Sequence, residues 1–129
     1  MSVQARDIAA RYARALERLE RCFDTPVETH RDVAGVIQHF EMQYELAWKL
    51  LKRRLEIEGM SASSPRQAFR AAFTAGLIDD EALWLGMIRD RNLSVHTYDE
   101  ALAWALMQRI QGGYLSAFRT LLVSKATQE

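Results

Sequence analysis

The residues best suited to chemistry lie close together, in the stretch RDRNLSVHTYD at positions 89–99. Arg91 offers a planar fork of donors that suits a phosphate or a carboxylate, and His96 follows it after four residues. With 14 arginines and three histidines in the chain, chance alone would give about a third of one such pair. A tyrosine two residues beyond the histidine, here Tyr98, lowers that expectation to about 0.01. The three residues therefore form a candidate site.

Helical geometry sets a condition on this site. In an uninterrupted helix, Arg91 and His96 would point about 140° apart, at about 100° per residue. The backbone must therefore break between them if they are to converge, and Asn92 and Ser94 favour a break because both bond to nearby backbone groups. The alternative is that Arg91 marks a helix C-terminus, that Asn92 ends the helix, and that His96 and Tyr98 are half-buried parts of a connection. The residues alone leave both interpretations open.

Apolar periodicity predicts the helices that would position this stretch. Apolar residues at three- and four-residue steps predict one helix over about 3–23 and a second from about residue 33 until Gly59. A shorter helix should follow, with Ser64 as its cap and Pro65 in its first turn. Gly76 should end that short helix.

Two further helices complete the pattern. One should begin after Asp79 as its cap, and the last should open near Asp99 and run to about residue 121. Gly112 and Gly113 lie inside this last helix, where they could allow a close helix approach or a bend. No stretch alternates as a half-buried strand would. We therefore expect one domain over 1–129: an all-α, antiparallel up-and-down bundle of four main helices plus a short extra helix.

Composition excludes several classes of protein. Acidic and basic residues balance at 17 each, so no bulk field would recruit nucleic acid. Cys22 is the only cysteine, which rules out an intrachain disulfide and predicts a packing role and a reducing, cytoplasmic location. The histidines lack metal-ligand spacing, and no phosphate-binding glycine loop occurs. No apolar run approaches the roughly 20 residues that span a bilayer.

Two stretches together resemble a known family. They are VIQHFEMQYELAWKLLKRRLE, at residues 36–56, and SPRQAFRAAFTAGLIDDEALWLGMIRDRNLSVHTYDE, at residues 64–100. They resemble the HEPN superfamily, in the branch of nucleotidyltransferase substrate-binding proteins, and the similarity covers nearly the whole chain. The segment RNLSVHTY matches the HEPN pattern of Arg, four residues, His, one residue and Tyr.

This resemblance implies a homodimer that brings two copies of the motif to one cleft and cleaves RNA without a metal or cofactor. His96 would act as a general base toward a ribose 2′-hydroxyl or as an acid toward the leaving oxygen, a role that suits an imidazole. Arg91 would stabilise charge on the phosphate, and Asn92 would position it.

The resemblance also implies a partner. In the paired systems of this family, a minimal nucleotidyltransferase (MNT) is the antitoxin, and Tyr98 would accept one or more AMP groups from it. Charge and bulk placed there could pair with Arg91 and obstruct RNA. The family also suggests a different activity, that of a non-catalytic subunit that presents substrate to its partner. A generic helical adaptor, in which the motif is a coincidence, is a third possibility.

Other residues resemble site residues but favour a structural role. The tryptophans lie in or beside apolar helical stripes, where aromatic residues are more often core than base-stacking platforms. They are Trp48, Trp84 and Trp104. A second set, Glu41, Glu45 and Lys49, could border the cleft, although a charged helix face is usually solvated. We therefore assign no catalytic role to either set.

Overall fold

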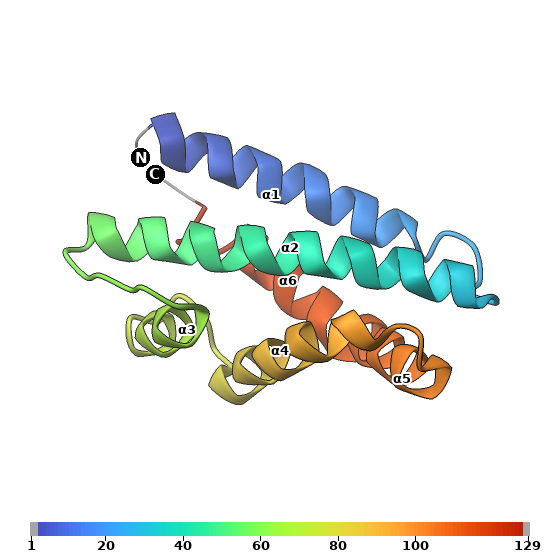
Figure 1. Cartoon of the computed structure of the whole chain (residues 1–129). Coiled ribbons are helices and arrows are strands. Elements are labelled where there is room, and N and C mark those ends of the chain that lie inside the picture. The colour runs from blue at the N-terminus through green and yellow to red at the C-terminus, as the bar shows by residue number, and fades with distance from the viewer. Residues whose placement is uncertain (1–2, 128–129) are drawn as a thin grey trace.

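The computed structural model describes residues 3–127, and its regular structure within that range is entirely helical (Figure 1). The helices, in chain order, are α1 (Val3–Arg21), α2 (His30–Ile57), α3 (Pro65–Thr74), α4 (Glu81–Leu93), α5 (Glu100–Arg109) and α6 (Leu115–Leu122). A 3₁₀ turn, Ser94–His96, follows α4, and a π-helical turn, Ile110–Tyr114, joins α5 to α6.

The helices form a bundle built around α2. Helix α1 lies antiparallel along α2, and α4 and α5 pack on the other side of α2, while α6 passes behind α2 and contacts both α1 and α2 (Figure 1). Because α5, the π turn and α6 follow one another without a loop, they count as one long helical path. Helix α3 is the short extra element and lies near the C-terminal end of α2 (Figure 1). The predicted all-α bundle of four main helices plus a short one is confirmed.

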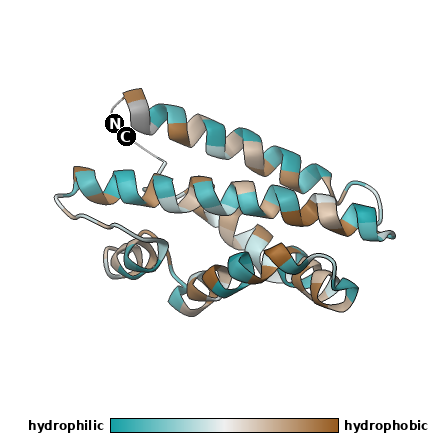
Figure 2. Cartoon of the chain, viewed as in Figure 1, coloured by the Kyte–Doolittle hydropathy of each residue, from teal (hydrophilic) through white to brown (hydrophobic). Residues whose placement is uncertain are grey.

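An aromatic core fixes the main helices to one another. Phe40 of α2 stacks on Tyr114 at 5.6 Å between ring centroids, and Trp84 of α4 meets Phe118 of α6 edge-on at 5.8 Å. Tyr12 of α1 is fully buried and donates its hydroxyl to the Phe118 carbonyl at 2.7 Å. Paired aromatic rings add specific geometry to the burial of their area. The outer faces of α1 and α2 carry mainly hydrophilic residues (Figure 2).

Most of the predicted helix ends are where the sequence places them. Ser64 and Asp99 cap α3 and α5 with their side-chain oxygens, each accepting from an amide of the first turn. The predicted cap Asp79 is wrong, because Asp80 performs this role and accepts from the Leu83 amide at 3.1 Å. Asp80 directly precedes the first helical residue, so its carboxylate reaches that amide, whereas Asp79 is one position too early.

Helix α2 begins earlier than its apolar pattern predicts. Thr29 accepts from the Asp32 amide, and the Asp32 carboxylate accepts from the Thr29 amide, so the two residues form a capping box. Gly59 and Gly76 follow α2 and α3 with φ of 83° and 77°. This left-handed backbone favours glycine and ends each helix, as predicted.

Gly112 and Gly113 lie in the π turn rather than at a close helix contact. A side chain at Gly112 would meet no atom within 4 Å, and one at Gly113 would meet only Leu83, at an ordinary 3.6 Å. The expectation of a close helix approach is therefore wrong. The π turn inserts extra backbone into the helical path and sets where Tyr114 points.

Candidate active site

The backbone changes form inside the candidate motif. Helix α4 ends at Leu93, and the tighter 3₁₀ turn then runs over Ser94–His96. The hydroxyl of the buried Ser94 lies 2.6 Å from the Arg91 carbonyl, and such a bond competes with the helical ladder. The break that the site requires between Arg91 and His96 is therefore present. The alternative interpretation is confirmed in part, because Arg91 and Asn92 lie in the last turn of α4, which ends one residue later at Leu93, whereas Tyr98 is exposed rather than half-buried.

Arg91 is held by side chains of its own turn and of α2. Its guanidinium donates to the Glu41 carboxylate at 2.8 Å and to the Ser94 hydroxyl at 3.1 Å. Its Nε also lies 3.8 Å from Glu45, within ion-pair distance. The Arg91 and Glu41 side chains are 31% and 29% exposed. Arg91 is thus oriented by carboxylates but still reaches solvent.

His96 and Tyr98 form a second pair on the surface. The His96 Nδ1 lies 2.7 Å from the Tyr98 hydroxyl, and the two rings meet edge-on at 5.4 Å. Tyr98 is 77% exposed, so a large partner can reach its hydroxyl. If the phenol donates, Nδ1 accepts and the ring proton lies on Nε2. A change at the Tyr98 oxygen therefore acts directly on His96.

The structure divides the predicted site residues into these two groups. Within residues 3–127, no hydrogen bond or ion pair joins Arg91 to His96. Ser94 connects the groups, since it contacts Arg91 and also lines a small cleft together with His96. Asn92 is exposed on α4, and no hydrogen bond of its side chain is found within the described chain. The motif therefore presents two separate side-chain groups, Arg91 with Glu41 and His96 with Tyr98, rather than one cluster.

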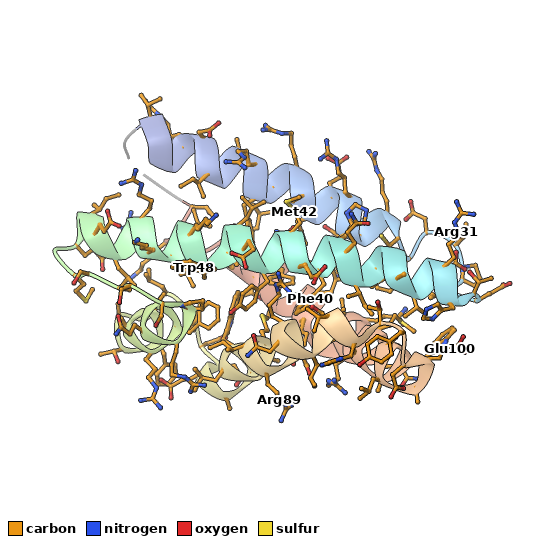
Figure 3. The ribbon with its side chains drawn as sticks, in the orientation of Figure 1. Arg31, Phe40, Met42, Trp48, Arg89 and Glu100 are labelled. Carbon is orange, nitrogen blue, oxygen red and sulfur yellow. The ribbon has the colours of Figure 1, made fainter. Side chains whose placement is uncertain are left out.

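A buried ionic network lies immediately behind the motif. Asp90 is fully buried, and Arg109 of α5 donates to both of its carboxylate oxygens, at 2.8 Å each. Tyr114, from the π turn, donates its hydroxyl to the same carboxylate. Arg89 lies at 4.0 Å and is largely exposed; Figure 3 shows it extending away from the helices. This network ties the end of α4 to α5 and to the π turn.

The electrostatics of this network are dominated by pairing. Burial alone would raise the pKa of Asp90, but the hydrogen bonds from Arg109 and Tyr114 outweigh it and hold the pKa below its ordinary value. Burial, followed by the bond to Asp90, raises the pKa of Tyr114 well above its ordinary value. Asp90 is therefore an anion and Tyr114 a neutral donor near neutral pH, which makes the network structural rather than a proton source.

Sequence reasoning missed the partners that hold the motif. Glu41 and Glu45 lie four residues apart on one face of α2, and the sequence suggested that they could border the cleft or be solvated, but nothing in it paired them with Arg91. Asp90 lies inside the motif, and its burial could not be read from its neighbours. Trp84 is core as expected, whereas Trp48 is half-buried and donates its indole N–H to Glu45 at 3.0 Å.

The described residues also bear on the expectations for Cys22, for a metal site and for a membrane-spanning helix. Burial raises the pKa of Cys22, which lies half-buried at the end of α1 and is not an activated thiolate. Over residues 3–127, no group of three or more His, Cys, Asp or Glu side chains could hold a metal ion. In the same range, no helix has the length and apolarity needed to cross a membrane.

Comparison with known proteins gives a family-level match over most of the chain. A family model described as "Nucleotidyltransferase substrate binding protein like" matches residues 8–126. Among curated proteins, a probable ribonuclease HepT from Haemophilus influenzae is 36% identical over 83 residues. That alignment covers 60% of this chain and 57% of the relative, so it spans little more than half of the relative's length.

Two solved structures share the fold. A crystal structure from Thermus thermophilus superposes with a TM-score of 0.80 at 35% identity, covering 86% of this chain and 95% of that one. A Haemophilus influenzae structure, described as the fold of a substrate binding domain of a nucleotidyltransferase, gives 0.74 at 28% identity and covers 92% and 96%. The likeness therefore extends over almost the whole of both proteins.

Proposed function

The chain belongs to the nucleotidyltransferase substrate binding protein-like family of the HEPN superfamily, and from this premise we propose that it is a metal-independent endoribonuclease controlled by a partner nucleotidyltransferase. The observation that carries the proposal is the contact of His96 Nδ1 with the exposed Tyr98 hydroxyl, at 2.7 Å. It places a candidate proton-transfer group and a candidate modification site in direct contact.

His96 would transfer the proton in the cleavage step. The ribose 2′-oxygen attacks the adjacent phosphorus, and the bond to the 5′-oxygen breaks, leaving a cyclic phosphate and a free 5′-hydroxyl. One imidazole can take the proton from the 2′-hydroxyl or give one to the leaving oxygen, but not both in the same step. A homodimer that brings two copies of the motif to one cleft would supply both groups.

Arg91 would stabilise the charge that develops on the phosphate, with Asn92 beside it to position the group. The support for this role is geometric, since the guanidinium is oriented by Glu41 and Ser94 yet remains 31% exposed. Glu41 is a partly exposed partner that an RNA phosphate would replace, because ion pairs in contact with solvent contribute only about 0–1 kcal/mol.

Tyr98 would be the off-switch. Transfer of AMP from ATP to its hydroxyl forms a phosphodiester and releases pyrophosphate, and the phenolic proton is lost to solvent. The product can no longer donate to His96, and it carries a negative charge that could pair with Arg91 and exclude RNA. The 77% exposure of Tyr98 supports access by a minimal nucleotidyltransferase acting as antitoxin.

RNA cleavage in EDTA by the purified protein tests this proposal. His96→Ala should lower the rate by about 10²–10⁴-fold, the range typical of a lost acid or base. His30→Ala and Arg89→Ala are matched controls on half-buried and exposed residues outside the proposed set, and both should remain active. Cleavage that survives His96→Ala, or that needs added metal, would contradict the proposal.

A second candidate function has its own support. The family description and the Haemophilus influenzae structure both refer to substrate binding for a nucleotidyltransferase, and Arg91 is already occupied by Glu41. The protein would then be a non-catalytic subunit. Absence of cleavage by the wild-type protein, together with tight binding to the nucleotidyltransferase, would favour this function. Mass mapping after incubation with the partner and ATP would show whether Tyr98 is modified.

A further inference from the structure

Three arginines of α1 form a stripe that the rest of the structure does not use. Arg11, Arg14 and Arg18 follow one another at steps of three and four residues, so they share one face of the helix. All three are exposed, and no hydrogen bond or ion pair of their side chains is found within residues 3–127. Such a stripe is ordinarily a solvated charged face. The carboxylates and apolar residues around it show whether it can also bind a ligand.

The carboxylates of α1 do not neutralise this stripe. Glu17 pairs with Arg21 at 2.7 Å, and Glu20 pairs with Arg119 of α6 at 3.0 Å. Asp7 is the remaining acidic residue of α1 and lies one turn before Arg11, at the N-terminal end of the stripe. The other two arginines of the stripe therefore have no local counter-charge, although the chain as a whole has a formal net charge of zero.

The stripe borders a hollow between α1 and α2. The hollow has a volume of about 300 Å³, and Met42 and Leu46 of α2 line it together with the three arginines and Ala15. Met42 is 55% exposed, and Figure 3 shows it at the seam between the two helices. An apolar floor with cationic walls suits a ligand that carries both anionic and flat apolar groups.

A second hollow extends this seam toward the start of α2. It also measures about 300 Å³, and its lining includes His39 and Arg31, the latter labelled at the far end of α2 in Figure 3. Asp32 lies there too, but its carboxylate already accepts from the Glu28 and Thr29 amides. His39 and Met42 are less than one helical turn apart, so the two hollows adjoin. We call them together the α1–α2 groove.

The groove lies beside the candidate active site. Met42 follows Glu41, the carboxylate that holds Arg91, so the groove and the motif lie on neighbouring faces of α2. Packed helices lie about 8–10 Å apart. A bound strand could therefore cross α2 and contact both regions.

We propose that the α1–α2 groove binds the phosphate backbone of single-stranded RNA, with Arg11, Arg14 and Arg18 contacting phosphates and Met42 and Leu46 packing against bases or riboses. This inference deepens the proposed function and rests on it, since RNA is the proposed substrate. Single strands are typically bound by a cationic groove that follows the backbone, with aromatic side chains stacked on the bases, and in this groove Met42 and Leu46 supply apolar contact in their place. Arginine forks suit phosphate geometry, and the α1 rise of about 4.5–6 Å between neighbours spreads them along a strand.

Binding of a single-stranded RNA oligonucleotide to the full chain tests the groove directly. Both variants are made in a His96→Ala background, which prevents cleavage during the measurement. The first carries Arg11→Gln, Arg14→Gln and Arg18→Gln. The control carries the same change of net charge at exposed positions away from the groove, namely Arg66→Gln, Arg70→Gln and Lys125→Gln. Fluorescence anisotropy at several salt concentrations gives the affinity and its salt dependence.

The groove variant should lose about tenfold or more in affinity at low salt, and its plot of log affinity against log salt should flatten by about 2, as three lost phosphate contacts predict. The control should change by less than about threefold. Equal losses in the two variants would show a net-charge effect and overturn the proposal. Unchanged RNA affinity with lost binding to the nucleotidyltransferase would make the groove a protein-docking surface. A shift in sedimentation for the groove variant alone would make it an interface between copies.

Cleavage separates this inference from the proposed function. With His96 present, the groove variant should cleave long RNA with a KM raised about tenfold. It should cleave an oligonucleotide too short to reach from the motif to the groove as fast as the wild type. If the wild type cleaves nothing, the proposed function fails, while the binding measurement still decides the groove. If the groove variant loses cleavage of the short oligonucleotide too, the stripe does not act through binding of the longer strand, and the inference fails.

Discussion

Asp90 and Arg91 are adjacent charged residues of α4 that meet very different surroundings. Asp90 is fully buried, and its partners Arg109 and Tyr114 come from the helical path that follows the motif. Arg91 is about one-third exposed and pairs with Glu41 on α2, which is exposed to a similar degree. Both carboxylates therefore pair with a partly exposed arginine, but Asp90 itself is fully buried whereas Glu41 is 29% exposed.

The difference shows how the end of a helix can be fixed in place while one of its side chains stays accessible to a ligand. A buried charge that loses its partner is left in a medium that cannot solvate it, so the Asp90 network is not exchanged for water. The Arg91–Glu41 pair is partly exposed, so solvent offsets more of its loss, and we expect that Arg91 can exchange Glu41 for another anion. Asp90 thus anchors the end of α4, and we expect Arg91 to bind its ligand from that anchored position.

The largest effect on stability should come from Arg109→Met, which removes the ion pair with the buried Asp90. It leaves the Asp90 carboxylate buried with Tyr114 as its remaining close partner, and it should lower the free energy of unfolding by about 3–5 kcal/mol at pH 7. Urea denaturation followed by circular dichroism measures this. A loss below about 1 kcal/mol would show that Asp90 is not an anchor.

The pH dependence of the same variant sharpens the test. In the wild type the pKa of Asp90 is lowered by its partners, so its contribution is present above the unfolded pKa, near 4, and is lost as the pH falls below it. Without Arg109 the burial of the carboxyl should raise its pKa above the unfolded value. Protonation then favours the folded state, so the stability deficit of the variant should shrink between pH 7 and 5. A deficit that is constant across this range would contradict the account.

A smaller effect should follow from Tyr114→Phe. The change removes the second donor to Asp90 but keeps the ring that stacks on Phe40. A hydrogen bond to a charged group contributes about 1.5–3 kcal/mol, and the loss of stability should fall in that range. Tyr12→Phe is a matched control, since it removes a buried hydroxyl that donates to a neutral carbonyl, and it should cost less. Equal losses would mean that the charge of Asp90 does not matter.

The smallest effect on stability should come from Glu41→Gln, in the partly exposed pair with Arg91. It removes the charge that pairs with Arg91 and keeps the side-chain shape, so the free energy of unfolding should change by no more than about 1 kcal/mol. The same denaturation experiment measures it. A loss as large as that of Arg109→Met would show that the two networks are equally structural, and the comparison would fail.

Local signals in the sequence predict the helices and most of their ends. Ser64 and Asp99 are caps, and Gly59 and Gly76 end their helices, because each depends on the conformation of only a few neighbouring residues. The break in the motif belongs to the same class, since Ser94 bonds to the Arg91 carbonyl three residues back. Such signals require no knowledge of the packing of the bundle.

These local signals did not reveal the partners of the site residues. Arg91 pairs with Glu41, 50 residues earlier in the chain, and only the packing of α4 on α2 brings them together. Asp90 depends on Tyr114, whose direction is set by a π turn that apolar periodicity does not reveal. The candidate motif was therefore recognised by its residue types, while the difference between its buried and its exposed side needed the structure.

The most direct test of this account measures RNA cleavage by Arg91→Met under conditions where the protein is fully folded. The account predicts a rate at least about 100-fold below the wild type, the scale of a lost charge-stabilising donor. It also predicts a free energy of unfolding within about 1 kcal/mol of the wild type, in contrast to Arg109→Met. An Arg91→Met protein that cleaves RNA at the wild-type rate, or that loses stability as Arg109→Met does, would contradict the division between an anchoring Asp90 and an acting Arg91.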